Sequence, residues 1–229
     1  MKRLLLTSAI ALLAATGAAA AADLIVEQPM VAAAPVAAGD WEGFYAGIVG
    51  GLGSGTVDYT DIGAMASADP SISGGMIGGT IGYNAQFDSM ILGIEGDLSW
   101  ANLNGSRNTG AAGVIFQGNV NWLGTLRGRV GIDLDPVLLY ATAGLATGAV
   151  TTTLSGAQVG GPFTTTHVGY TVGGGAEFKV TEDVSVKAEY LYTDLGRRDI
   201  PAGALWGVST ANTAQASFHA IRVGANFHF

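Results

Sequence analysis

The stretch that decides the fold is the last one, ASFHAIRVGANFHF, from Ala216 to Phe229. Successive side chains of a β-strand point to opposite faces of a sheet. One face of this stretch is apolar and consists of Ile221, Val223, Ala225, Phe227 and Phe229. The other face consists of Arg222, Gly224, Asn226 and His228. The alternation fits a soluble sheet with its apolar face inward, and it also fits a transmembrane barrel with its apolar face toward lipid.

The amino terminus has the organisation of an export signal. Two basic residues precede a short apolar run from Leu4 to Leu13, and alanines up to Ala22 supply the small residues that a signal peptidase requires. We therefore predict a signal peptide over residues 1–22, cleaved between Ala22 and Asp23, with cleavage after Ala21 as the near alternative. The apolar run is too short for a membrane anchor.

Composition excludes several classes of protein. Without the two basic residues of the signal, 8 basic residues remain against 18 acidic ones, so the mature formal charge is 8 − 18 = −10. Such an acidic exported chain is not expected to bind nucleic acid. The chain has no cysteine, which excludes a disulfide scaffold, a thiol nucleophile and a thiolate metal site. After the signal no stretch approaches the ~20 apolar residues of a membrane helix, whereas alternating apolar residues are typical of a membrane β-barrel.

The mature chain divides into a short tail and one domain. Residues 23–40 are rich in Ala, Pro and Val, and we predict a flexible periplasmic segment there. Residues 41–229 are predicted to form eight amphipathic strands. Their approximate bounds are Gly43–Gly53, Gly75–Phe87, Met90–Trp100, Gly118–Ile132, Val137–Val150, Thr165–Val180, Val184–Leu195 and Ala216–Phe229. In the first strand the sequence leaves open which face is the apolar one.

The connections between these strands alternate in length. Long segments rich in Gly, Ser and Thr follow the first, third, fifth and seventh strands, over residues 54–73, 102–117, 151–164 and 196–215. Tight turns follow the others. Bacterial outer-membrane barrels combine short periplasmic turns with longer external loops, whereas a lipocalin-like soluble barrel has no reason to alternate them. We predict an all-β fold, an eight-stranded antiparallel transmembrane up-and-down β-barrel.

The polar strand faces carry four acids and four bases, which we expect to meet inside the barrel. This predicted lumen charge network consists of Glu95, Asp97, Arg127, Arg129, Glu177, Lys187, Glu189 and Arg222. Lys179 is a ninth candidate. An eight-stranded interior has room only for packed side chains or one small ligand, so we favour a salt-bridged plug. The alternative is a gate, in which the charges exchange partners and open a path of low conductance.

No grouping of residues indicates catalysis. The paired acids share their faces with as many bases, which does not indicate a hydrolase, and we find no His/Ser/Asp-type grouping. His167 and His219 are expected near the external ends of their strands, and His228 at the periplasmic end. Two rim histidines are residues that a haem or metal site would use, but isolated polar residues are the favoured interpretation. We expect no catalytic residue, no metal and no cofactor.

Several segments carry a resemblance to a known family. They include GIEGDLSW at 93–100, LRGRVGIDLDPVLLYATAGLA at 126–146, VGYTVGGGAEFKVTEDVSVKAEYLYTDLG at 168–196 and IRVGANFHF at 221–229. In this order and spacing the chain resembles the eight-stranded, porin-like outer-membrane β-barrel family of α-proteobacterial surface antigens. The resemblance implies an abundant, surface-exposed protein of the cell outer membrane that contributes to envelope integrity and host contact. Some members are called porins, and some relatives are haemin binders.

These observations lead to a structural and surface-interaction role in the outer membrane. A small diffusion porin is the alternative, and a haemin-binding surface protein is less favoured. The expected partners are outer-membrane lipid and lipopolysaccharide, host surface ligands at the external loops, and the barrel-assembly machinery. The carboxy-terminal residues Ile221, Val223, Ala225, Phe227 and Phe229 resemble the signal that this machinery reads.

Overall fold

The computed structural model describes residues 40–61, 66–68, 71–108, 115–155, 162–200 and 212–229. The predicted signal peptide, its cleavage site between Ala22 and Asp23, and the predicted periplasmic segment therefore lie outside the described residues, apart from Asp40. None of the described residues forms a helix long and apolar enough to cross a membrane.

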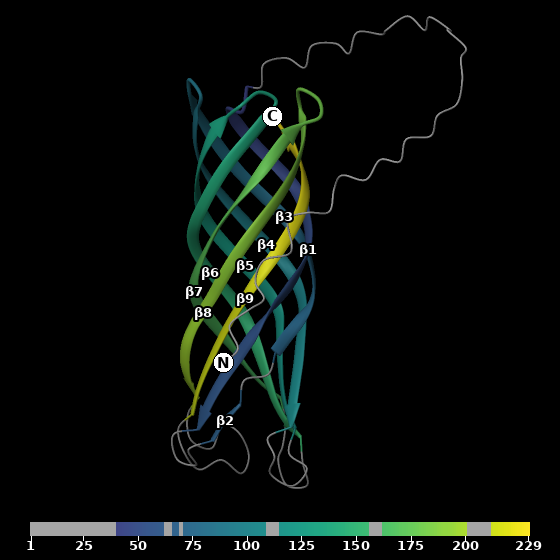
Figure 1. The fold of residues 1–229 in the computed structure, drawn as a ribbon, viewed down its shortest axis with the longest axis vertical. Helices are drawn as coiled ribbons and strands as arrows, with labels where there is room; N and C mark the ends of the chain where they lie inside the picture. Colours follow the sequence, from purple (N-terminus) through teal and green to yellow (C-terminus); the bar gives the residue numbers. More distant parts are fainter. Residues whose placement is uncertain (1–39, 62–65, 69–70, 109–114, 156–161, 201–211) are drawn as a thin grey trace, which may run out of the picture. The chain divides into compact units, whose positions relative to one another are not determined.

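The described residues form eight long strands that close into one antiparallel barrel. The long strands are β1 (Gly43–Asp61), β3 (Ser71–Phe87), β4 (Met90–Asn108), β5 (Ile115–Asp133), β6 (Val137–Ser155), β7 (Pro162–Lys179), β8 (Val184–Ile200) and β9 (Asn212–His228). A short strand, β2 (Ala66–Ala68), pairs only with the end of β1. Each long strand pairs with its neighbour in the chain, and β1 pairs with β9 from Tyr45–His228 to Asp61–Asn212, which closes the sheet. Figure 1 shows the strands wound around one axis. The predicted fold class is confirmed.

Near the tight turns the barrel is apolar outside and polar inside. Outward side chains such as Leu52, Trp100 and Ile221 are 72%, 75% and 67% exposed, respectively. A water-soluble protein does not expose so many large apolar groups together, but a barrel in lipid does. The open question about the first strand is settled, because Ile48 is exposed whereas Tyr45 is buried. We call this band of outward apolar side chains the apolar belt.

Toward the long-loop end the polarity of the two faces is inverted. Inward side chains there are apolar and 0–1% exposed, as in Val57, Leu103 and Phe218. Outward positions are polar, as in Asn104 and Gln117. This half of the barrel has the pattern of a water-soluble sheet, with its core inside. In bacterial outer-membrane barrels the short turns lie on the periplasmic side, which predicts that this half projects outward from the membrane.

The inversion explains where the predicted strand bounds were wrong. The segment 54–73 was predicted as a loop, but β1 continues through it to Asp61 and β3 begins at Ser71. In the same way β4 runs on to Asn108 and β6 to Ser155. The alternation that identified each strand ends at the membrane surface, although the strand itself does not. The tight turns after Phe87, Asp133 and Lys179 lie where the sequence places them.

Candidate functional site

Five strands bring the eight predicted network residues together inside the barrel. β4 supplies Glu95 and Asp97, β5 supplies Arg127 and Arg129, β7 supplies Glu177, β8 supplies Lys187 and Glu189, and β9 supplies Arg222. Within each strand the members are two residues apart, so they share the inward face. Their side chains are 0–3% exposed. The charges therefore face one another and not water.

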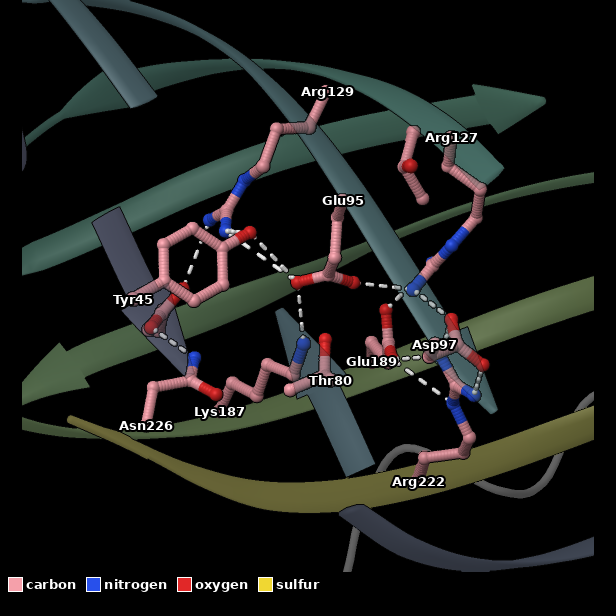
Figure 2. Close-up of polar contacts among 12 residues, drawn as sticks. Tyr45, Thr80, Glu95, Asp97, Arg127, Arg129, Lys187, Glu189, Arg222 and Asn226 are labelled. Atoms are coloured by element: carbon pink, nitrogen blue, oxygen red, sulfur yellow. Dashed lines mark hydrogen bonds and ion pairs between the residues drawn. The ribbon is translucent and has the colours of Figure 1, made fainter. Parts of the chain in front are cut away.

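Arg127 lies at the centre of the network. Its guanidinium donates to Asp97 Oδ2 at 2.9 Å, to Glu189 Oε2 at 3.0 Å and to Glu95. Arg222 donates to Asp97 Oδ1 at 2.9 Å and pairs with Glu189 Oε1 at 2.5 Å. Two acids and two arginines thus form a closed ring of ion pairs between β4, β5, β8 and β9 (Figure 2). Charge-assisted and bidentate pairs of this kind are the strong ones.

Glu95 joins this ring to a second group nearer the periplasmic end. Lys187 Nζ donates to Glu95 Oε2 at 2.7 Å, across the barrel interior (Figure 2). Arg129 lies 3.8 Å from the same oxygen and donates to Glu177 Oε2 at 2.8 Å. Glu177 also accepts from Ser185 and Asn226, at 2.6 and 2.7 Å. Strands that are not neighbours in the sheet, such as β4 and β8, are therefore tied to each other across the lumen.

The network is balanced in charge. Four carboxylates face four cationic groups, so the eight side chains sum to zero, 4 − 4 = 0. Burying one unpaired charge costs several kcal/mol, and removing one partner of a buried pair typically costs about 3–5 kcal/mol. Every member has at least one oppositely charged neighbour within 4 Å. The eight charges therefore neutralise one another inside the barrel.

Sequence reasoning missed two tyrosines that complete the network. Tyr45 on β1 donates to Glu95 Oε2 at 2.8 Å and accepts from Arg129 at 3.0 Å. The Arg129 guanidinium also lies 4.1 Å from the centre of the Tyr140 ring, a cation–π contact. The strand alternation placed Tyr140 on the inner face, and its proximity to charged residues was the available signal. For Tyr45 the strand sequence offered apolar groups on both faces.

A cap at the periplasmic end was also missed. Trp41, just before β1, is fully buried among strand ends. Its backbone N–H donates to Gln86 Oε1 at 2.8 Å, and its indole Nε1 donates to Asp133 Oδ1 at 3.2 Å. Lys179 Nζ lies 5.2 Å from the centre of the indole ring and donates to the carbonyl of Glu182 at 3.2 Å. Lys179 was the ninth candidate for the charge network, but in the structure it belongs to this cap.

An apolar layer lies on the other side of the network. It is a cluster of buried inward side chains that includes Val57, Ile72, Met76, Leu103, Val120, Leu123, Val150, Leu195 and Phe218. The lumen thus has three layers, which are the Trp41 cap, the ion pairs and this apolar cluster. Val57, Ile72 and Leu103 lie in segments predicted as loops, so the sequence did not place them inside. The other members lie within the predicted strands.

The histidines do not form a joint ligand set. His167 is buried inside the barrel, whereas His219 is exposed on the outer face, where Tyr190 lies 2.5 Å from its Nδ1. His228 lies inside, 2.9 Å from Ser185 Oγ. Within the described residues no group of three His, Asp or Glu side chains has the geometry to hold a metal.

The predicted carboxy-terminal signal residues lie along the outer face of β9. Ile221, Val223 and Phe227 are exposed in the apolar belt, and Phe229 is 78% exposed. The Phe229 N–H donates to the carbonyl of Phe44 on β1 at 2.9 Å. The end of the chain is therefore part of the closure seam.

Sequence comparison gives matches over the whole chain. The family model for the outer membrane protein beta-barrel domain matches residues 8–229. The chain is 34% identical to the 31 kDa outer-membrane immunogenic protein of Brucella melitensis, over 100% of both chains. It is 38% identical to the 22 kDa outer membrane protein of Rhizobium leguminosarum bv. viciae, over 71% of this chain and 68% of that one.

Structural comparison gives more distant matches. OprG of Pseudomonas aeruginosa has 14% identity and a TM-score of 0.49, with 83% of this chain and 99% of that chain covered. Ail of Yersinia pestis has 13% identity and a TM-score of 0.35, with 79% of this chain and 99% of that chain covered.

Proposed function

Because the chain belongs to the outer-membrane protein β-barrel domain family, we propose that it acts as a closed structural barrel, which strengthens the outer membrane and presents its long-loop end to the surroundings. The protein is an outer-membrane protein, and its apolar belt is in contact with lipid. The observation that carries the proposal is the neutral, buried ion network between the Trp41 cap and the apolar layer. Three successive layers of packed side chains support a plug more than a pore.

The same observation bears on the other two classes of function. A diffusion porin needs a hydrated path, but the side chains of the network are 0–3% exposed. An enzyme needs an acid or base that is free to react, whereas each carboxylate of the network is engaged by cations or by hydrogen-bond donors. We therefore infer neither transport nor catalysis. We also infer contacts with lipopolysaccharide, with the barrel-assembly machinery and with host ligands at the external loops, as expected from the sequence.

Conductance in a planar lipid bilayer tests the closed barrel. We expect wild-type protein to give no conductance steps above the bare-bilayer level, because the apolar layer stays dry. We expect the same of Arg127→Gln and Arg129→Gln, since both substitutions lie below that layer. A difference between boiled and unboiled samples in gel mobility serves as the folding control for each preparation.

Two results would contradict the proposal. Stepwise conductance in the wild type would support a porin. Conductance that rises specifically when Arg127 or Arg129 is neutralised would support the gate, in which exchange of ion-pair partners opens the lumen.

A further inference from the structure

The outward side of β4, β5 and β6 beyond the apolar belt carries an uncharged polar surface. It is formed by three amides and three hydroxyls, and we call it the amide–hydroxyl face. Its members are Asn104, Ser106, Gln117, Asn119, Thr151 and Thr153. None of these six positions carries a charge.

The six side chains line a groove of about 530 Å³. This volume falls within the roughly 300–1,000 Å³ of small-molecule sites. Asn104 and Thr151 also hydrogen-bond within the protein, to Asn102, Asn121 and Thr164. The groove therefore has the size of a binding site and a lining of amides and hydroxyls.

The register places the groups in two parallel rows. Asn104, Asn119 and Thr151 are direct cross-strand neighbours and form the first row. Ser106, Gln117 and Thr153 form the second row in the same way. Neighbours of this kind are about 4.5–5.5 Å apart, which is close to the length of one sugar residue. Amides and hydroxyls both donate and accept, as the hydroxyls of a neutral sugar do, whereas a phosphate or carboxylate ligand would favour arginine or lysine.

The position of the face limits what can reach it. Trp100 on β4 is 75% exposed, and its direct cross-strand partner on β5 is Trp122. Tryptophans of membrane proteins gather at the membrane–water interface. The first row begins only a few residues beyond this pair, on the lipid-facing side of the barrel. The molecules next to it are therefore the headgroups of the surrounding outer leaflet, and the Trp100 ring provides an apolar surface for the face of a sugar.

We propose that the amide–hydroxyl face binds neutral sugar residues of the lipopolysaccharide around the barrel. The inference rests on the proposed outward orientation of the long-loop end and on the proposed contact with lipopolysaccharide, and it gives that contact a place and a chemistry. Binding there ties the outer half of the barrel to neighbouring glycolipids through sugar hydroxyls.

Titration of the folded full-length mature protein tests this proposal. Three probes are compared in vesicles of one phospholipid composition: lipopolysaccharide with its complete core oligosaccharide, its lipid A part alone, and the free oligosaccharide. Binding is followed by tryptophan fluorescence. The variants are Asn119→Ala/Thr151→Ala on the face and Thr56→Ala/Ser217→Ala as a matched control. Thr56 and Ser217 are also outward cross-strand partners, on β1 and β9 at the opposite side of the barrel.

We expect the wild type and the control to bind complete lipopolysaccharide at least about tenfold more tightly than lipid A. The face variant should lose this preference, since two lost neutral hydrogen bonds correspond to about a tenfold change in affinity. Equal binding of both glycolipids by the wild type, or an equal loss in both variants, would overturn the proposal. Preference for the free oligosaccharide over the complete glycolipid would overturn the assignment to the surrounding membrane. The conductance experiment contains no sugar, so it tests the closed barrel independently of the sugar-binding proposal.

Discussion

At the scale of single residues, Tyr45 and Gly82 show how the interior is filled. They face each other across β1 and β3. A Cβ atom on Gly82 would lie 2.3 Å from Cζ of the Tyr45 ring, so only glycine allows the ring to lie flat on the sheet there. The ring position in turn brings the tyrosine hydroxyl to Glu95 and Arg129. A residue without a side chain therefore supports the charge network.

Gly82→Ala is expected to destabilise the barrel by about 1–3 kcal/mol, the usual cost of overpacking a filled interior. The reason is that the Tyr45 ring must move and lose its hydrogen bonds. Gly79→Ala is the matched control on the same strand, because a Cβ there meets only a carbonyl oxygen at 3.7 Å. Denaturant unfolding in detergent micelles measures both variants. Equal midpoints for the two would contradict this account of Gly82.

The sequence predicts the charged part of the site better than the aromatic part. Glu95 and Arg127 were placed on inner faces because a charged side chain on the lipid-facing side of a membrane strand is unfavourable. Tyr45 has no such constraint, since a tyrosine suits both the lipid interface and the lumen. Trp41 precedes the first strand, so strand alternation does not orient it. Its burial depends on four strand ends that meet only in the folded barrel.

At the scale of elements, β9 is where the barrel closes. It pairs with β8 on one side and with β1 on the other. Phe229 continues the pairing beyond the strand through its bond to Phe44, and its ring lies 5.2 Å from that of Phe227 in an edge-on arrangement. An open sheet edge is not tolerated in hydrocarbon, so the last strand must arrive before the barrel is stable in lipid.

Deletion of Phe229 is expected to lower insertion into the outer membrane several-fold, with little effect on synthesis or export. The expectation follows from the loss of the terminal aromatic group that the assembly machinery is proposed to read, together with one bond of the seam. Membrane fractionation, with total and exported protein measured in parallel, gives the result. Phe178→Ala removes another lipid-facing aromatic and should insert normally. Normal insertion of the deletion would refute the assembly role.

The element bounds were predictable at one end of the barrel only. Turns such as Asp133–Pro136 carry their own local chemistry, and these bounds agree with the structure. At the long-loop end, strands were recognised by apolar residues on their outward face. Beyond Leu52 or Trp100 the outward residues are polar, so the predicted strands ended too early. A search for the inverted pattern, with Val57 or Leu103 facing in, would have extended the strands.

At the scale of the whole molecule, the lumen is closed by layers that use different forces. Trp41 closes the periplasmic mouth by packing and hydrogen bonds to β3 and the end of β5. The ion pairs fill the middle, and apolar contacts fill the outer half. Electrostatic strength in the middle depends on keeping water out at both ends, because the effective dielectric rises with hydration.

Trp41→Ala is expected to lower the stability of the barrel by about 3–5 kcal/mol, as removal of a buried aromatic usually does. Because the cap also shields the ion pairs, the variant should become more sensitive to salt than the wild type. The measurement is the temperature at which the unboiled gel band converts to the unfolded position, at low and high salt. Trp100→Ala, which removes an exposed tryptophan, should show neither change. An unchanged conversion temperature in Trp41→Ala would argue against the cap.

The inversion of the two faces also has a mechanical consequence, because it sets the depth of immersion. If the barrel sank by two residues along its strands, about 7 Å of strand length, Asn104 and Asn119 would enter hydrocarbon. If it rose by as much, the branched side chains of Leu98 and Leu145 would meet water. Both displacements are unfavourable, since thickness mismatch costs energy with every ångström. The barrel is thus held at one depth in the membrane. Every ligand that binds its outer half therefore binds at a fixed height above the bilayer.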